Sequence, residues 1–273
     1  MVFKHDMEVS FSFGKNWQVF LKSLNKERFD FAEKSLKEFM KIKNMKGKSF
    51  LDIGCGSGLF SYTAHKLGAK NVVSFDVDPF SVQCCKHMYK VANNPKNWII
   101  HDGSILDDKF VSKLGKFDIV YSWGVLHHTG NMWEAIRKSA KLVERGGYYY
   151  IALYNKKGGV LGSNMWLIIK KMYNRSSNLG KYLIEAFYMT AYLSAYTVKM
   201  KNPFSHIRDY YKTKRGMNFR TDVTDWLGGY PYEFATTEEI YHFMKKEFPD
   251  FDLVNMKTVK GLANNWFLFK RRE

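Results

Sequence analysis

The chain has 273 residues, of which 45% are hydrophobic, and it carries a formal net charge of +17. This length is enough for one sheet domain of roughly 150 to 200 residues with an elaboration. Its three cysteines form no ligand-like pair, which excludes a disulfide framework and a cysteine-based zinc site. The charge favours an anionic partner, such as a phosphorylated metabolite, RNA or a membrane surface, unless it is only a solvated lysine-rich surface.

Two segments bear on localisation. Met1–Ser10 contains no apolar run of the kind found in secretory signals, so we expect a cytoplasmic protein. The longest apolar stretch, Leu183–Met200, is interrupted by Glu185 and Lys199. We therefore expect a buried or interfacial helix there, and no transmembrane segment.

The first predicted element is an amphipathic helix over residues 25–43, with Asn25 as its cap. Just before it, Phe11–Trp17 concentrates aromatic residues without a clear period. This segment is either a flap over a ligand or the ordinary packing of a chain terminus.

From Ser49 onward, short apolar runs alternate with helical patterns, which is typical of βα units that feed a parallel sheet. Asp78 and Pro79 have the form of a helix start, and Asp78 reads as a cap rather than a ligand. Strands are predicted at 49–53, 72–76, 97–101, 117–122 and 148–154, and helices at 59–67, 79–91, 107–114 and, behind Asn131, 132–142.

The end of the chain predicts a helix and a hairpin. Thr236 and Glu239 have the spacing of a capping box, which begins a helix that runs through Phe248. Two strand-like runs, Asp252–Lys260 and Asn264–Phe269, follow. The predicted organisation is an N-terminal helical segment (1–48), an α/β core (49–155), a helical insertion (156–235) and a final helix and hairpin that complete the core (236–273).

The strongest chemical signal is a buried strand that runs into a glycine-rich turn, Asp52-Ile-Gly54-Cys-Gly56-Ser-Gly58. Glycines allow a backbone to turn sharply against a ligand, and the following helix start offers free N–H groups. Asp76 follows Gly58 by 18 positions at the end of the next strand, where a carboxylate can accept both hydroxyls of a ribose.

The spacing inside this turn distinguishes two ligands. The third glycine comes two positions after the second, not three, and Asp52 stands two positions before the first. A carboxylate there is a poor neighbour for a pyrophosphate and a good one for an amino group. The turn therefore favours a zwitterionic ligand over a dinucleotide.

Four segments together resemble the successive motifs of class I S-adenosylmethionine-dependent methyltransferases: Leu51–Phe60, Ser74–Pro79, Asp102–Leu106 and Phe117–His128. The resemblance covers about residues 50 to 155 and implies a doubly wound, seven-stranded, mostly parallel α/β sheet. Within that superfamily, the chain most resembles the ubiquinone-biosynthesis-like group of small-molecule methyltransferases.

The resemblance also implies roles for single residues. Asp52 and the Gly54–Gly58 backbone would hold the methionine part of the cofactor, Asp76 the ribose and Val77 one face of the adenine. Ser104 stands where many relatives have an aspartate that contacts the adenine amino group, so that contact would be weaker or made by Asp102 or the backbone. The predicted cofactor-binding residues are Trp17, Asp52, Gly54, Cys55, Gly56, Gly58, Asp76, Val77, Asp102, Gly103, Ser104, Ser122 and Trp123.

His127 and His128 follow the fourth strand, at the sheet edge where open α/β sheets bind ligands. Either imidazole could act as general base for a hydroxyl acceptor, while at least one of the two is expected to have only a packing role. Some ubiquinone-pathway relatives bind a metal through acidic residues in this loop. Gly124 and His127 stand at the aligned positions, so no metal is predicted.

The insertion combines aromatic residues with basic clusters, Lys170–Lys171 and Lys212–Arg215, and holds 13 basic against 5 acidic residues. It is interpreted as a lid over the acceptor pocket or as a packing layer. We expect a small-molecule acceptor, anionic or aromatic, methylated on oxygen. The alternatives are an RNA-modifying methyltransferase and a non-catalytic cofactor-binding protein of the same fold.

Overall fold

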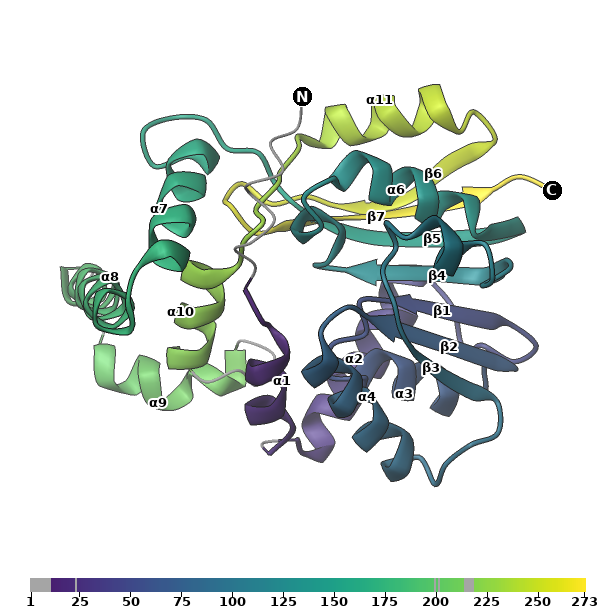
Figure 1. Ribbon diagram of the computed structural model, residues 1–273, viewed down its shortest axis with the longest axis horizontal. Helices are drawn as coiled ribbons and strands as arrows, with labels where there is room; N and C mark the ends of the chain where they lie inside the picture. The colour runs from purple at the N-terminus through teal and green to yellow at the C-terminus, as the bar shows by residue number, and fades with distance from the viewer. Residues whose placement is uncertain (1–10, 23, 199, 201, 214–218) are drawn as a thin grey trace.

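The computed structural model describes residues 11–22, 24–198, 200, 202–213 and 219–273 (Figure 1). The expectation for Met1–Ser10 therefore lies outside the described residues, as do Lys214 and Arg215 of the second basic cluster.

A seven-stranded sheet with the order β3-β2-β1-β4-β5-β7-β6 forms the centre of the molecule. The β7 strand runs antiparallel to both of its neighbours, β5 and β6, and the other strand pairs are parallel. The predicted doubly wound, mostly parallel fold is therefore confirmed. The β5 strand begins five residues before the predicted start, because Val143 already pairs with Phe117 across a register shift in β4. The strands are β1 (Ser49–Ile53), β2 (Asn71–Asp76), β3 (Trp98–Asp102), β4 (Phe117–Trp123), β5 (Val143–Tyr154), β6 (Phe251–Lys257) and β7 (Asn264–Arg271).

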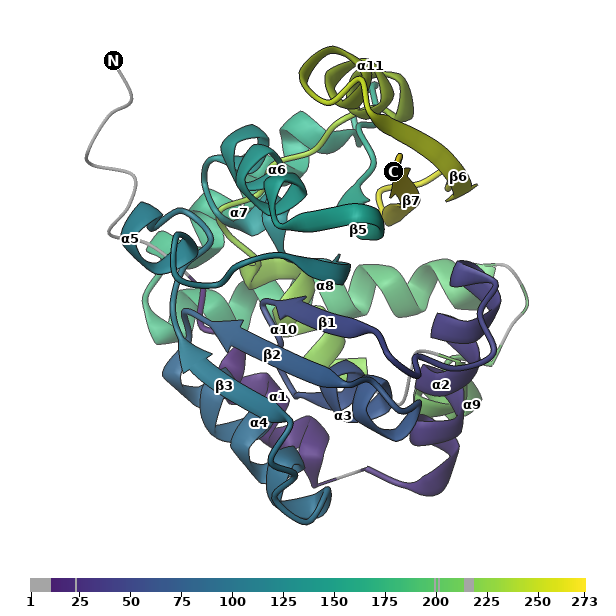
Figure 2. The same cartoon turned by 90° about the vertical axis from the view of Figure 1, so that its right-hand side faces the viewer.

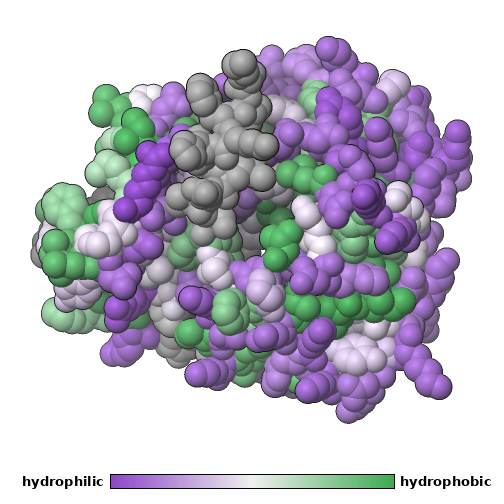
Figure 3. Space-filling view, viewed as in Figure 1, coloured by the Kyte–Doolittle hydropathy of each residue, from purple (hydrophilic) through white to green (hydrophobic). Residues whose placement is uncertain are grey.

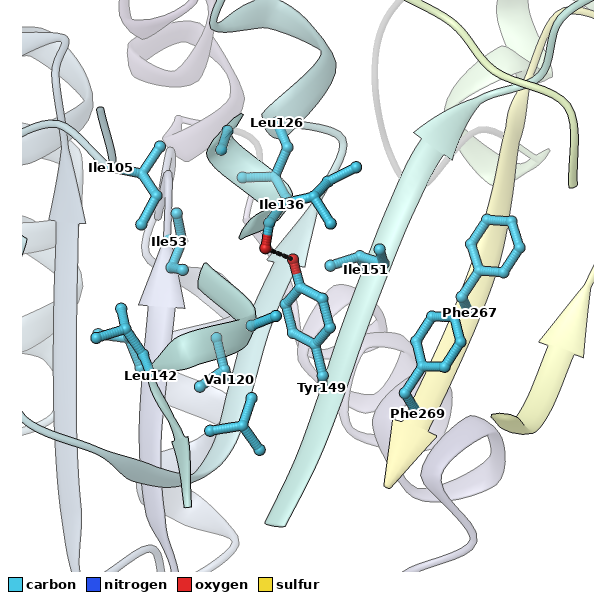
Figure 4. Close-up of a cluster of buried hydrophobic side chains, with 14 of the residues drawn as sticks. Ile53, Ile105, Val120, Leu126, Ile136, Leu142, Tyr149, Ile151, Phe267 and Phe269 are labelled. Atoms are coloured by element: carbon cyan, nitrogen blue, oxygen red, sulfur yellow. Dashed lines mark hydrogen bonds between the residues drawn. The ribbon is translucent and has the colours of Figure 1, made fainter. Parts of the chain in front are cut away.

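Helices cover both faces of the sheet, as Figure 2 shows. One face packs against α2 (Lys26–Met40), α3 (Leu59–Lys66) and α4 (Pro79–Val91). The other packs against α5 (Asp108–Val111), α6 (Met132–Lys141) and α11 (Thr237–Glu247). In the second core, Tyr149 of β5 points in among aliphatic side chains, and its buried hydroxyl is hydrogen-bonded to Ser139 (Figure 4).

The local start signals of the helices are mostly those predicted from the sequence. Asn25 accepts a hydrogen bond from the Arg28 N–H, and Asp78 accepts one from the Phe80 N–H. Thr236 and Glu239 form the predicted capping box. Asn131 is the exception, because its side chain makes no cap. The Glu233 carboxylate, from a distant segment, accepts the Met132 N–H instead.

A small helical unit lies beside the carboxyl ends of the parallel strands, at the left of Figure 1. It consists of α7 (Ser163–Arg175), α8 (Asn178–Val198), α9 (Pro203–Thr213) and α10 (Phe219–Gly228), which we call the lid. The lid has its own buried cluster, including Tyr173, Tyr210 and Phe219. Among the described residues, no helix is both long and apolar enough to cross a membrane.

The N-terminal segment, predicted as helical over 1–48, contains one helix whose position the sequence did not indicate. The aromatic segment Phe11–Trp17, which shows no clear period, leads into α1 (Gly14–Leu21). This helix packs against α4, and the Phe11 N–H donates to the carbonyl of Tyr230 beyond the lid. The N-terminal segment therefore bridges the sheet domain and the lid.

Candidate functional site

A cavity of about 1520 Å³ lies where the carboxyl ends of β1, β2 and β4 face α1 and the lid. Pockets for a single drug-sized ligand are typically about 300 to 1,000 Å³. The cavity is therefore large enough for two ligands side by side. Its two ends differ in chemistry, since one is built from backbone and carboxylates of the core and the other from aromatic side chains of the lid.

The glycine turn after β1 forms one wall. Gly54 and Gly56 have φ values of +70° and +51°, which favour glycine. A Cβ on Gly54 would lie 2.3 Å from Val125, and a Cβ on Gly56 would lie 2.8 Å from Nε1 of Trp17. The turn is thus held between the loop after β4 and α1, with its backbone against the cavity.

Two carboxylates, the buried Asp52 and the half-buried Asp76, stand beside this turn. Asp76, at the end of β2, accepts the Gly56 N–H at 3.0 Å and the Asp78 N–H at 2.9 Å. Asp52 accepts the Ser61 hydroxyl at 2.5 Å. Burial raises the pKa of Asp76 to about 6 and that of Asp52 to about 7. A cationic ligand group or a set of hydroxyl donors would stabilise their ionised forms.

The α1 helix closes this end of the cavity. The Ser12 hydroxyl and the Gly14 N–H both donate to Asp78, at 2.7 and 2.9 Å, so the carboxylate that caps α4 also anchors α1. Asn16 donates to Asp225 of the lid helix α10. Trp17 then lines the cavity beside Gly56.

His128 lines the cavity. Its Nδ1 is 2.5 Å from the Pro231 carbonyl oxygen. A carbonyl can only accept, so Nδ1 carries the proton and Nε2 keeps a lone pair. Burial lowers the pKa of His128 to about 3, and the imidazole is therefore neutral at physiological pH.

Four of the predicted site residues lie outside the cavity lining. His127 is fully buried, and its Nδ1 accepts the Tyr154 N–H at 3.2 Å. Ser122 donates to the Ile53 carbonyl inside the sheet. Gly58 begins α3 where a Cβ would lie 2.7 Å from Cys85, so it serves helix packing. Asp102 is exposed at the end of β3. The predicted residues that do line the cavity are Trp17, Asp52, Gly54, Cys55, Gly56, Asp76, Val77, Gly103, Ser104, Trp123 and His128.

The lid end of the cavity has aromatic walls and acidic groups. Asp222 accepts the Tyr210 hydroxyl, and burial raises the pKa of Asp225 to about 7. Behind the wall, the buried Lys170 ammonium lies 4.4 Å from the ring centre of Trp226, and burial lowers its pKa to about 7. The aromatic lining comes from Tyr188, Tyr192, Tyr210, Phe219, Trp226 and Tyr230.

The cavity is acidic although the chain is basic. Among the described residues, its lining includes seven aspartates and glutamates but only two lysines or arginines, Arg28 and Lys171. The positive charge that suggested an anionic acceptor therefore lies mainly outside the cavity. Among the described residues, no group of three or more His, Cys, Asp or Glu side chains is placed to hold a metal ion.

Sequence reasoning missed several polar residues of the lining. Asp225 accepts a hydrogen bond from Asn16, which is 209 positions away and lies outside the lining. Glu233 reaches the start of α6 across 101 positions. Asn264, at the start of β7, lines the cavity with a buried side-chain oxygen that has no hydrogen-bond partner. No local pattern marks these residues, because each acquires its neighbours only in the folded chain.

Known proteins with similar sequences and folds bear on this site. A family model described as a methyltransferase domain matches residues 44–221. The ubiquinone biosynthesis O-methyltransferase of Pelagibacter ubique is 28% identical over 140 residues, which cover 50% of this chain and 56% of that protein. A putative protein N5-glutamine methyltransferase of Methanocaldococcus jannaschii is 32% identical over 97 residues, or 36% of this chain and 46% of that protein.

These alignments span about half the length of the two curated relatives. The fold itself extends further. The crystal structure of magnesium protoporphyrin IX methyltransferase from Synechocystis, with bound SAH, matches with a TM-score of 0.55 at 14% identity. That match covers 94% of this chain and 93% of the other.

Proposed function

The chain belongs to the methyltransferase domain family, as a class I S-adenosylmethionine-dependent methyltransferase, and from this premise we propose that it methylates an oxygen atom of a small molecule with an aromatic or otherwise flat apolar body. The observation that carries the proposal is His128, a neutral imidazole that lines the same cavity as the glycine turn and the aromatic side chains of the lid. The O-methyltransferase name of one relative supports oxygen as the acceptor atom.

The core end of the cavity is the proposed cofactor site. Asp52 and the Gly54–Gly58 backbone would hold the methionine part, Asp76 the ribose hydroxyls and Val77 the adenine. The buried carboxylates suit the positive charges of this ligand, and Trp17 closes the site from α1. When bound, the cofactor supplies an electrophilic methyl group on a positively charged sulfur.

His128 is the proposed general base. The Pro231 carbonyl fixes the proton on Nδ1, which leaves Nε2 to accept the proton of an acceptor hydroxyl as the oxygen–carbon bond forms. Because burial lowers the pKa of His128 to about 3, its imidazole is unprotonated when the acceptor binds. The walls of the cavity align the acceptor, which supplies a further part of the rate enhancement.

The two alternatives have less support from the cavity. A lining with seven carboxyl groups repels a phosphate backbone, which disfavours RNA as the acceptor. A non-catalytic binder would need neither the fixed imidazole nor an aromatic second compartment. The remaining candidate acceptor, a protein amide, has only the name of one relative in its favour.

The test is to incubate the purified protein with methyl-labelled cofactor and fractionated cell extract, and to identify the methylated product by mass spectrometry. With that acceptor, His128→Ala should lower turnover about 10² to 10⁴-fold while cofactor affinity changes little. His242→Ala, on the exposed face of α11, is the matched control and should be unaffected. Full turnover by His128→Ala would remove the proposed base, and cofactor binding without any labelled product would favour the non-catalytic alternative.

A further inference from the structure

The polarity of α8 is the reverse of that of an ordinary surface helix. Its only charged residues are Lys181 and Glu185, and both lie on the side that faces the rest of the lid. Glu185 is 8% exposed and accepts hydrogen bonds from the hydroxyls of Tyr173 and Thr224, at 2.5 and 3.2 Å. Lys181 lies over the Tyr173 ring. A helix of a water-facing unit normally turns such residues outward.

The outer side of α8 is apolar and uncharged. Leu179, Leu183, Phe187 and Val198 are 57 to 84% exposed, and their spacing places them on one face of the helix. The residues between them on this face are small, such as Thr190 and Ser194. We call the four large residues the outer face of α8. Figure 3 shows hydrophobic side chains along the left-hand edge of the molecule, where Figure 1 shows α8.

This surface extends beyond one helix. The adjacent α7 exposes Ile168 and Met172, and α9 exposes Phe204. Of the twenty large hydrophobic side chains exposed in the described part of the chain, twelve lie between residues 160 and 207. The opposite side of α8 already has its role, because Tyr188 and Tyr192 line the cavity. The outer face is thus unused by the proposed reaction.

Basic residues are in excess in this part of the sequence. Residues 160–220 contain eleven lysines and arginines but only two acidic residues. One of these acids is the buried Glu185, and the other, Asp209, forms an ion pair with Arg208 at 3.1 Å. Arg175, Arg208 and Arg220 are exposed. Apolar side chains combined with excess basic residues fit the interface of a bilayer that carries anionic headgroups.

We propose that the outer face of α8, with the adjoining surfaces of α7 and α9, binds the surface of an anionic membrane, with the helix lying in the plane of the headgroups. Charge complementarity selects this partner over a second copy of the chain, since a symmetric contact would bring the same excess of positive charge together from both sides. The inference concerns a surface separate from the cavity and does not depend on the identity of the acceptor.

The test is flotation of the full-length protein with vesicles of phosphatidylcholine alone or mixed with phosphatidylglycerol. The wild-type protein should float with the anionic vesicles, and added salt should release part of it. Leu183→Glu with Phe187→Glu should reduce partitioning by at least about tenfold. Val254→Glu changes an exposed apolar residue on β6 and is the matched control. Arg175→Gln should reduce binding to anionic vesicles by up to about fivefold.

A milder variant covers the case in which the double change disturbs the fold. Phe187→Cys, labelled with an environment-sensitive dye, should give a blue-shifted signal on anionic vesicles, whereas labelled Val254→Cys should not. The three native cysteines are buried and should not label in the native protein. The proposal fails if wild-type protein does not bind anionic vesicles. It also fails if the double variant Leu183→Glu with Phe187→Glu binds these vesicles as well as the Val254→Glu control does. A third contradicting result is a dimer in ultracentrifugation that Phe187→Glu dissociates and that persists when anionic vesicles are added.

Discussion

Asp76 shows how a single carboxylate can join the backbone of the site to its ligand. It accepts N–H groups from the glycine turn and from the residue after β2, and each oxygen retains a lone pair for a ligand hydroxyl. We predict that Asp76→Asn weakens binding of S-adenosylmethionine by about 1.5 to 3 kcal/mol, the usual value of a charged hydrogen bond. Calorimetry on the folded variant measures this directly.

Asp102 provides the matched control for that prediction. It was also expected to bind the cofactor, but it is exposed at the end of the neighbouring strand, outside the cavity lining. Asp102→Asn should therefore leave affinity unchanged within error. Equal losses for the two variants would mean that the ribose site is misplaced.

The raised pKa values of Asp52 and Asp76 predict a pH dependence of cofactor binding. In the free protein, burial raises these values to about 7 and about 6, so both carboxyls take up protons as the pH falls through this range. A ligand with positive charges binds the ionised forms. Affinity should thus be constant above about pH 8 and fall below pH 6 by about tenfold or more per pH unit. Calorimetry between pH 5.5 and 8 tests this, and a flat profile would refute it.

The histidine pair shows what a sequence cannot resolve at the residue scale. His127 and His128 are adjacent and chemically identical, and the sequence indicated only that at least one of them packs structurally. In the fold, His127 accepts a hydrogen bond from the Tyr154 N–H of β5, and His128 donates one to the Pro231 carbonyl. Both partners come from other segments of the chain, so spacing alone could not distinguish the two side chains.

At the scale of elements, the lid supplies the aromatic compartment. Tyr188 and Tyr192 project from the inner side of α8 into the cavity, while Thr190 on the same helix is exposed on the other side. We predict that Tyr188→Ala raises the acceptor KM about 5 to 100-fold, through lost aromatic contact, and leaves cofactor affinity within twofold. Steady-state kinetics with the identified acceptor tests this.

Thr190→Ala is the control for this variant and should behave as wild type. If Tyr188→Ala instead weakens cofactor binding and leaves the acceptor KM unchanged, the two compartments are assigned in the wrong order. The interpretation of residues 156–235 as a lid over the acceptor pocket would then be wrong, and the acceptor site would have to be sought around Phe11–Trp17.

The boundary between the lid and the core differs from the one predicted from the sequence. Glu233 accepts the first N–H of α6, and Asn155 pairs with Ala235. These contacts place residues 230–235 with the core in packing terms, although the sequence groups them with the insertion. Gly228 and Gly229 mark the turn between the two parts, and a Cβ at Gly228 would lie 2.3 Å from Phe11.

For the whole molecule, ligand binding should appear as added stability. A ligand at about 100 times its Kd stabilises a protein by about 2.7 kcal/mol, which is roughly 5 to 10 °C in Tm for a domain of this size. We predict such a shift with S-adenosylmethionine or its demethylated product and none with NAD. Differential scanning fluorimetry measures it, and a shift with NAD alone would overturn the assignment of the glycine turn.

The charge of the whole molecule divides between an acidic cavity and a basic exterior. Composition gave the total of +17 but not its distribution, and the expectation of an anionic acceptor followed from that total. Folding brings seven carboxyl groups from α2, the core and the lid to one cavity and leaves most lysines and arginines outside. The positive charge of the exterior therefore affects which partners the protein surface contacts, whereas the chemistry of the cavity determines which ligands the cavity binds.

The sheet, the glycine turn, most helix starts and the helical insertion could be predicted from the sequence, because these depend on periodicity and on contacts within a few positions. It did not locate α1 within the N-terminal helical segment, and it gave no sign that Glu233, 101 positions away, accepts the first N–H of α6. Tertiary structure alone decided which histidine faces the cavity, where the charges gather and which side of α8 meets solvent. Those features depend on contacts between distant segments, which no local pattern records.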